Sequence, residues 1–327
     1  MCTLPGVPLP SQSAAISRRR MLGTGAAGAV GVAGAGLVGA GASASPAQAA
    51  PGKRKIDPRH ISIQLYTLSA LTATDLDGTL EALAEIGFTR VEHAGIPEGM
   101  TARQFRAALN RHGLRSTSGH NTPPSDPLNR NAWRRVLDDA NTLGQKTVNW
   151  SAPGLKGFDP VTGPVFIETK DEWLRLAELV NEAGLMAHRN GLKFGLHNHF
   201  WEFAPVEGTP LTGSDILFAE TDPRYVNFEI DIYWAWYGHN DPARIVALEQ
   251  DRVTQFHVKD MSLVSPPSDQ GEYTFTDPGA GIIDFARIFA AKKDTAQTEF
   301  IIERDDAGTD ALRTARRGFR FLRNLRW

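Results

Sequence analysis

The chain has 327 residues, a formal net charge of −2 and a single cysteine, Cys2. This length suffices for one barrel-sized domain with a sizeable core. The slight negative charge argues against a basic nucleic-acid-binding surface, and one cysteine excludes an internal disulfide.

Residues 1–50 are predicted to be a twin-arginine signal peptide, and residues 51–327 a single domain. Ser17–Leu22 (SRRRML) carries the arginine pair, Gly23–Ala42 is rich in glycine and alanine, and Ala47–Ala49 matches a small-residue cleavage site. A retained anchor is the competing interpretation, but glycine and alanine bury little apolar surface. We expect no stable membrane insertion and export by the twin-arginine machinery to the periplasm, cell-wall space or medium.

Cleavage after Ala49 would remove 49 of the 327 residues, with three arginines and no acid, and leave 278 residues with a net charge of −5. Cys2 would leave with them. The mature protein would then have neither a disulfide nor a thiolate metal ligand.

From Ile61 onward, short β-like runs alternate with amphipathic helical stretches, as in βα units around a parallel sheet. Helices are expected at Leu76–Glu85, Thr101–Arg111 and Glu172–Asn190, each soon followed by a glycine of the kind that ends a helix. Eight strands are expected: Ile61–Tyr66, Thr89–His93, Arg115–His120, Thr147–Trp150, Lys193–His197, Val226–Asp231, Val253–Val258 and Phe300–Glu303.

Eight β–α repeats over this length predict an α/β fold, a (β/α)8 TIM barrel, as a single domain. The alternative is an open doubly wound sheet, which would carry a glycine-rich phosphate loop after a strand, and none follows a strand here. In a barrel the strand ends converge on one mouth. The long connections Ser151–Thr169 and Met261–Gly281 are expected there as lids or substrate walls.

Strands five to eight end on residue types that bind metals. These are His197 or His199, then Asp231, His257 and Glu303. A nitrogen and oxygen set of this kind accepts one divalent ion, such as Mn²⁺, Co²⁺, Mg²⁺ or Zn²⁺.

The fifth strand offers two histidines, because His197 and His199 share a face at period two. Either can be the ligand. The other would orient it, donate to a substrate oxygen, or be an ordinary hydrogen-bonded interior histidine. Glu202 follows between two aromatic residues, where desolvation would raise its pKa and suit an acid or base, with an ordinary salt bridge as the alternative.

The sixth strand alternates polar and apolar residues, with Asn227, Glu229 and Asp231 on one face. Buried polar groups need partners or a metal. Asp231, nearest the mouth, is the expected ligand. Trp234 follows, and its ring would stack on a sugar or pack in the core.

The seventh and eighth strands add two further candidates. Lys259 shares a side with His257, and beside a cation it would polarise a carbonyl or steady an enolate; a structural ion pair with Asp260 or Glu303 is the alternative. Glu303 can both bind the metal and move a proton, because a carboxylate has two oxygens.

Taken together and in order, these segments resemble the xylose isomerase-like sugar phosphate isomerase/epimerase superfamily of TIM barrels, from about Ile61 to the C-terminus. The segments that carry the resemblance are SIQLYTL, GFTRVEHAG, LRSTSGH, LHNHFWEF, EIDIYW, FHVKD, PGAGIIDF and FIIERD. Their order is specific for the superfamily and not for a substrate.

The resemblance implies one divalent ion bound by residues from strands five to eight, here Asp231, His257 and Glu303. Ketose epimerases of this superfamily carry a glutamate at strand five, where this chain has His197. Epimerisation can use two carboxylates, one on each face of the carbon. A histidine in place of this glutamate therefore favours a one-base reaction, either isomerisation or β-elimination of the keto-glycoside lyase or dehydratase type.

The same superfamily includes apurinic endonucleases, which take further His and Glu ligands from strands two to four. Glu92 and His120 are present here, but strand four ends in Asn149 and Trp150 without a carboxylate. A nuclease is therefore not expected, and Glu92, His120 and Tyr66 are expected to contact substrate instead.

The sequence thus predicts a metal-dependent enzyme that removes the proton α to the carbonyl of a keto-sugar or sugar derivative. Glu303, Lys259, His199 and Glu202 are the catalytic candidates. The alternatives are a ketose or sugar-phosphate epimerase and a sugar-binding barrel without catalysis. The expected partner is a small carbohydrate and not a nucleic acid, and a homo-oligomer is compatible with the sequence.

Overall fold

The computed structural model describes residues 54–124, 127–268 and 271–327. The twin-arginine segment predicted for residues 1–50 lies outside the described residues.

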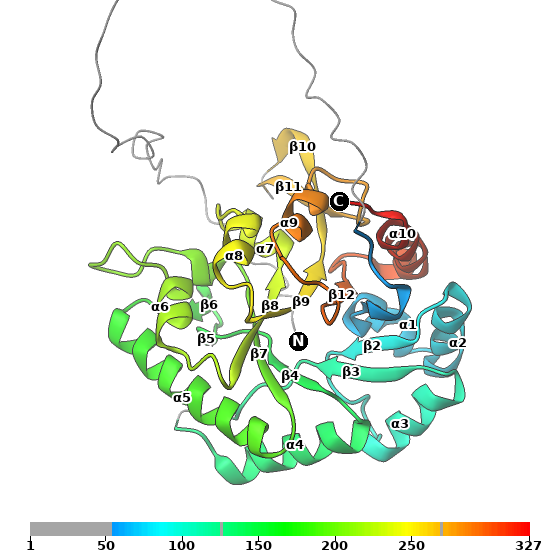
Figure 1. Cartoon of the computed structure of the whole chain (residues 1–327), viewed down its shortest axis with the longest axis horizontal. Coiled ribbons are helices and arrows are strands. Elements are labelled where there is room, and N and C mark those ends of the chain that lie inside the picture. The colour runs from blue at the N-terminus through cyan, green and yellow to red at the C-terminus, as the bar shows by residue number, and fades with distance from the viewer. Residues whose placement is uncertain (1–53, 125–126, 269–270) are drawn as a thin grey trace, which may run out of the picture.

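Eight parallel strands form a closed barrel (Figure 1). Hydrogen bonds join six of them in the order β1-β12-β9-β8-β7-β4 and the other two as β2-β3, and the bridges Gln64–Glu92 and His120–Asn149 connect the two groups. The barrel strands are β1 (Ile61–Ile63), β2 (Arg90–His93), β3 (Arg115–Gly119), β4 (Thr147–Trp150), β7 (Lys193–His197), β8 (Val226–Asp231), β9 (Val253–Val258) and β12 (Glu299–Ile302). The barrel prediction is confirmed. The first strand is shorter than predicted, the second and third are each one residue shorter, and the last is shifted by one residue.

Helices surround the barrel in an outer ring (Figure 1). Their boundaries follow local signals: Thr101 and Thr169 form capping boxes, and Gly87 ends α2 in the left-handed conformation. None of the helices in the described residues is long and apolar enough to cross a membrane. The helices are α1 (Ser69–Thr72), α2 (Leu76–Ile86), α3 (Ala102–Arg111), α4 (Arg130–Leu143), α5 (Lys170–Arg189), α6 (Gly213–Glu220), α7 (Ile232–Tyr237), α8 (Pro242–Leu248), α9 (Phe285–Ala290) and α10 (Ala311–Asn324). In the part of the chain that the structure describes there are also four 3₁₀ turns: η1 (Pro58–His60), η2 (Leu65–Leu68), η3 (Trp201–Phe203) and η4 (Gly308–Asp310).

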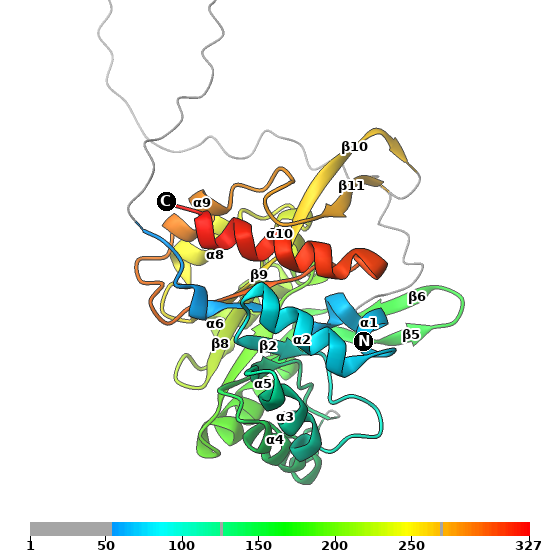
Figure 2. The ribbon, with the colours of Figure 1, turned by 90° about the vertical axis from the view of Figure 1, so that its right-hand side faces the viewer.

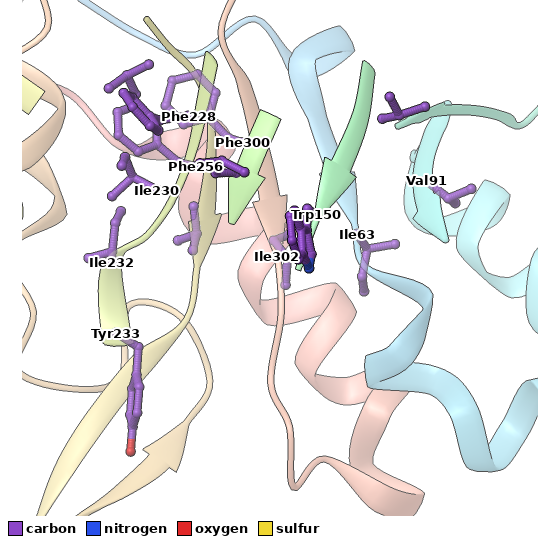
Figure 3. Packing of buried hydrophobic residues seen from close by; sticks show 14 of the residues in the cluster. Ile63, Val91, Trp150, Phe228, Ile230, Ile232, Tyr233, Phe256, Phe300 and Ile302 are labelled. Atoms are coloured by element: carbon purple, nitrogen blue, oxygen red, sulfur yellow. The ribbon is translucent and has the colours of Figure 1, made fainter. Parts of the chain in front are cut away.

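The hydrophobic core lies between the strands and the helices. Figure 3 shows Phe228, Ile230, Phe256, Phe300 and Ile302, all buried, on the strands. Each fully buried aromatic or aliphatic side chain contributes about 1.5–3 kcal/mol to folding. Because side chains alternate along a strand, the intervening residues face the barrel interior. In β7, β8 and β9 those interior residues are largely polar, so the interior must supply their partners.

The two long connections contain antiparallel hairpins, β5 (Leu155–Asp159) with β6 (Gly163–Phe166), and β10 (Asp260–Ser268) with β11 (Gly271–Thr276). The sequence had predicted lids or substrate walls at these two connections without assigning strands to them. In the first hairpin, Asp159 Oδ1 accepts hydrogen bonds from the amides of Val161 and Thr162, which fixes the turn. Figure 2 shows both hairpins projecting from the same end of the barrel.

Candidate metal centre and active site

Four side chains from four strand ends meet at the mouth of the barrel. His197 ends β7, Asp231 ends β8, His257 lies in β9, and Glu303 directly follows β12. All four are buried, and one potential ligand atom from each lies within 4.8 Å of the others. We call these four residues the tetrad. They converge because parallel strands end at the same edge of the barrel.

Each of the two imidazoles of the tetrad contacts a glutamate that lies deeper in the barrel. Nδ1 of His197 lies 3.0 Å from Oε2 of Glu229, which leaves Nε2 facing Asp231 Oδ2 at 3.8 Å. Nε2 of His257 lies 2.8 Å from Oε1 of Glu92, and its Nδ1 lies 2.6 Å from Glu303 Oε2. Each ring therefore gives one nitrogen to a deeper glutamate and turns the other toward the tetrad, as metal-binding histidines do.

Asp231 presents one carboxylate oxygen to the tetrad. Its Oδ1 accepts a hydrogen bond from the amide of Trp234 and so caps α7. Its Oδ2 is buried and pairs with the ammonium of Lys259, 3.1 Å away. Lys259 also pairs with Glu303, so one ammonium serves both carboxylates of the tetrad. The tetrad therefore fits a further cation, which would bind both carboxylates and replace the proton between His257 and Glu303.

Lys259 lies among three carboxylates beside the tetrad. Its Nζ is 3.1 Å from Asp231, 3.1 Å from Glu303 and 2.8 Å from Asp305. Burial alone would lower its pKa, but these carboxylates raise the pKa of Lys259 well above its ordinary value. The lysine is therefore a fixed positive charge.

Glu303 is ionised in this environment. Burial alone would raise its pKa, but Lys259 and His257 hold the pKa of Glu303 well below its ordinary value. An ionised carboxylate is the form that binds a metal or accepts a proton.

A second polar layer lies directly beneath the tetrad. The side-chain amide of Asn149 donates to Glu92 at 3.1 Å, to Glu229 at 2.7 Å and to Gln255 at 3.0 Å. His120 Nε2 lies 3.2 Å from Glu92 and 3.3 Å from Glu229. Glu92, expected to contact substrate, is fully buried in this layer. Asn149 and Gln255 were missed as site residues, and the signal that could have found them is the alternation of polar residues along β4 and β9.

A second group, His120, His197, Glu229 and His257, also brings its possible ligand atoms within 4.8 Å of one another. Its members already contact one another through Glu229 Oε2, at 3.3 Å, 3.0 Å and 3.3 Å. The other oxygen of Glu229 accepts a hydrogen bond from Asn149 at 2.7 Å, so protein groups already occupy both oxygens of this carboxylate. The tetrad is therefore the better candidate for a metal ion.

His199 lies next to the tetrad without belonging to it. Its ring stacks on Trp201, with centroids 4.3 Å apart and planes 8° apart, and lies 5.7 Å from Trp234. Its Nδ1 is buried without a hydrogen-bond partner. Of the two histidines that the sequence left as alternatives, His197 is the one placed in the tetrad.

Glu202 is placed behind the strands and does not join the tetrad. It accepts a hydrogen bond from the amide of His199 at 2.9 Å. Its side chain lines a small cavity of about 20 Å³ together with Leu196 and Phe228, which lie on the outer side of β7 and β8. Burial raises the pKa of Glu202 well above its ordinary value. Glu202 thus supports the turn that carries His199.

Aromatic rings form a wall at the mouth beside Lys259. The Lys259 ammonium lies 5.3 Å from the ring centroid of Trp234 and 5.9 Å from that of Phe275, a residue of the β10–β11 hairpin. Tyr66 lies in η2 directly after β1, at the same end of the barrel. The hairpin thus contributes a ring that the sequence did not predict for the site.

Sequence comparison relates the chain to one family over most of its length. The pattern of a family described as xylose isomerase-like TIM barrel matches residues 80–325. Inosose dehydratase from Halalkalibacterium halodurans is 30% identical over 136 residues, which are 38% of this chain and 43% of that protein. The chain therefore matches less than half the length of this relative.

Solved structures share the fold. A sugar phosphate isomerase/epimerase from Parabacteroides distasonis superimposes with a TM-score of 0.66 at 22% identity, covering 82% of this chain and 94% of that one. The IOLI protein, solved with a bound zinc atom, superimposes with a TM-score of 0.58 at 14% identity, covering 80% of this chain and 97% of that one.

Proposed function

Because this chain belongs to the xylose isomerase-like TIM barrel family, we propose that it is a divalent-metal-dependent enzyme acting on a keto-sugar or related sugar derivative. The reaction is removal of a proton α to a carbonyl, leading to isomerisation or to β-elimination. The observation that carries the proposal is the buried tetrad, in which one potential ligand atom from each of four side chains lies within 4.8 Å of the others.

His197, Asp231, His257 and Glu303 would bind the ion. When bound, a divalent ion acts as a Lewis acid on a carbonyl oxygen. Two imidazoles and two carboxylates accept Mn²⁺, Co²⁺, Mg²⁺ or Zn²⁺. The zinc atom in the structurally similar IOLI protein makes Zn²⁺ the first ion to test.

The protein's own residues supply the proton chemistry. Glu303 is ionised and has two oxygens, so it could take the proton as well as help to hold the ion. Lys259, fixed between Asp231, Glu303 and Asp305, places a positive charge where the enolate oxygen would develop. The ring of His199 lies 5.0 Å from that of His197, and its Nδ1 has no hydrogen-bond partner, so it would be available to donate to a substrate hydroxyl.

Elimination is supported by two features. The strand-five position of the tetrad is His197 and not a second carboxylate, which suits a one-base reaction better than two-base epimerisation. Inosose dehydratase, a relative at 30% identity over part of its length, carries out a dehydration by its name.

The test combines metal content with solvent isotope exchange. Protein purified without added metal is analysed for metals, then loaded and incubated with keto-sugars in deuterium oxide. We expect deuterium at the carbon α to the carbonyl, with loss of a leaving group if the enzyme is a lyase. Absence of both exchange and turnover would indicate a binding protein.

Matched variants connect that result to the tetrad. Asp231→Ala and His257→Ala should lose the metal and turnover, whereas Asp139→Ala on the exposed surface of α4 should retain both. Full metal content and full turnover in both tetrad variants would show that these residues are not the ligands.

Export by the twin-arginine route is a separate proposal, supported by Ser17–Leu22. Replacing Arg18 and Arg19 together with lysine should retain the protein inside the cell, while Arg20→Lys should leave export intact. Equal export of both variants, measured by fractionation, would contradict the proposal.

A further inference from the structure

The connections at the mouth of the barrel contain few basic residues. In sequence they hold 17 acidic residues and three basic ones, Lys156, Lys259 and Arg304, counted over residues 64–75, 94–101, 120–129, 151–169, 198–212, 232–241, 259–284 and 303–310. A substrate that carries a phosphate or carboxylate is normally met by free lysine or arginine side chains or by unoccupied backbone amides. In this structure the contacts of the basic side chains and of the backbone amides decide whether either is available to a substrate anion.

All three basic side chains are already paired with carboxylates. Lys259 contacts Asp231, Glu303 and Asp305, as described above. Arg304 donates to Asp277 at 2.9 Å and to Asp306 at 2.6 Å. Lys156, at the base of the β5–β6 hairpin, lies 2.9 Å from Glu172. None of the three offers an unpaired positive charge to a substrate.

The backbone amides after the seventh barrel strand are also occupied. TIM barrels often bind phosphate in the loops after strands seven and eight. Here the Pro-Gly-Ala-Gly loop that follows β11 points its amides at the buried carboxylate of Asp260. Asp260 accepts from Met261 at 2.8 Å, from Gly279 and Gly281 at 2.9 Å each, and from Ile283 at 3.3 Å. The carboxylate of Asp260 therefore occupies the backbone amides that could otherwise bind an anion.

The loop after the eighth strand is acidic. Asp305 and Asp306 follow Glu303 and Arg304, and Asp310 is the N-cap residue of α10. A helix N-terminus attracts anions, but Asp310 places a carboxylate of the chain at this one.

The charged groups around the tetrad also argue against a substrate that carries a phosphate or carboxylate. The carboxyl groups of Asp231, Glu303 and Asp305 all contact the single ammonium of Lys259. An ammonium has three N–H donors, so Lys259 keeps none for a substrate anion. The aromatic wall of Trp234 and Phe275 contributes apolar surface of the kind that stacks on the C–H face of a sugar ring.

From these contacts we infer that the substrate of this site is an uncharged keto-sugar or cyclitol ketone, without a phosphate or carboxylate group. The inference rests on the proposed function and narrows its substrate class. It separates this chain from enzymes that act on sugar phosphates in spite of the shared fold.

The test uses the full metal-loaded protein and matched pairs of compounds. D-fructose, 3-keto-D-glucose and 2-keto-myo-inositol are assayed for turnover and for binding by calorimetry, each beside its own monophosphate, with inorganic phosphate as a further probe. We expect the neutral member to be preferred by at least about tenfold in kcat/KM or affinity, because an added dianion finds carboxylates at the mouth whose cationic and amide partners are already occupied. Inorganic phosphate should not compete.

Preference for a phosphorylated member would overturn the inference and leave the proposed function intact. Failure of every compound to bind or react would overturn the proposed function, and the inference with it. Exposed Arg175 lines the surface pocket beside β4 together with Lys156, so Arg175→Ala identifies a phosphate bound there. Loss of phosphate-ester turnover in that variant would also count against the inference.

A charge variant tests the electrostatic cause. Asp305→Asn removes one mouth carboxylate and should reduce the discrimination against the phosphorylated member several-fold. Asp139→Asn, which removes an exposed carboxylate from α4, should leave the discrimination unchanged. Equal discrimination in both variants and the parent protein would show that these carboxylates do not exclude anionic substrates.

Discussion

Glu299 links the stability of the barrel to pH. It begins β12, at the opposite end of the strand from Glu303, and its side chain points into the barrel floor. Its Oε1 accepts a hydrogen bond from Thr117 Oγ1 at 2.5 Å, and its Oε2 lies 4.0 Å from Arg90. Burial, the largest influence, raises the pKa of Glu299 to about 7. The substitution Glu299→Gln keeps the shape and the hydrogen bond from Thr117 but removes the ionisation.

The expected magnitude follows from linkage. A pKa that rises from 4.5 in the unfolded chain to about 7 in the folded protein corresponds to about 3 kcal/mol of unfolding free energy. Below pH 4.5 the carboxyl is protonated in both states and carries no penalty. As the pH rises through about 7, the free energy of unfolding falls by this amount, because the carboxyl ionises more easily in the unfolded chain than in the folded protein.

The assay is urea unfolding of metal-free protein at pH 5 and pH 8, for the parent and for Glu299→Gln. We expect similar unfolding free energies at pH 5 and a variant more stable than the parent by about 2–3 kcal/mol at pH 8. Glu178→Gln, on the exposed face of α5, is the control for removing a carboxylate and should show no such difference. A constant difference between parent and Glu299→Gln at both pH values would refute the reasoning.

Three further predictions concern the site and its supports. Glu229→Gln should weaken divalent-ion binding about 10–100-fold, measured by competition with a chelator, because Glu229 orients His197; unchanged affinity would contradict that role. Phe275→Ala should raise KM for the sugar with little change in Tm, since it removes one ring of the mouth wall; an unchanged KM would place the substrate elsewhere. Gly279→Ala should lower the unfolding free energy by about 1–3 kcal/mol, measured in urea, because Gly279 has φ +85° and its added Cβ would collide with Phe321; unaltered stability would show that the loop adapts.

Local patterns in the sequence were enough to predict the barrel. Thr147–Trp150, Lys193–His197, Val226–Asp231 and Val253–Val258 begin and end in the structure as predicted. Each is a short β-rich run followed by turn residues, so short-range preferences decide its limits. The end of the first strand depends less on short-range preferences. The 3₁₀ turn η2 begins at Leu65, because Gln64 accepts a hydrogen bond from the amide of Tyr66 and turns the chain.

The site was partly predictable for the same reason. Asp231, His257 and Glu303 follow apolar runs at strand ends, and parallel strands must bring such ends together. The sequence could not choose between His197 and His199, nor place Glu202, because η3 turns the chain after β7 and directs Glu202 behind the strands. Phe275 was missed because the sequence assigned no strands to the Met261–Gly281 connection, although it placed that connection at the mouth.

The sequence by itself determined which residues alternate inward and which end a strand, since both depend on neighbours along the chain. Only the tertiary structure decided that Glu229 and Glu92 lie beneath His197 and His257 and set which ring nitrogen faces the tetrad. It also decided that Asp260 occupies the amides of a loop about twenty residues away. These contacts join strands and loops that meet only when the barrel closes, and no local pattern encodes the distances between them.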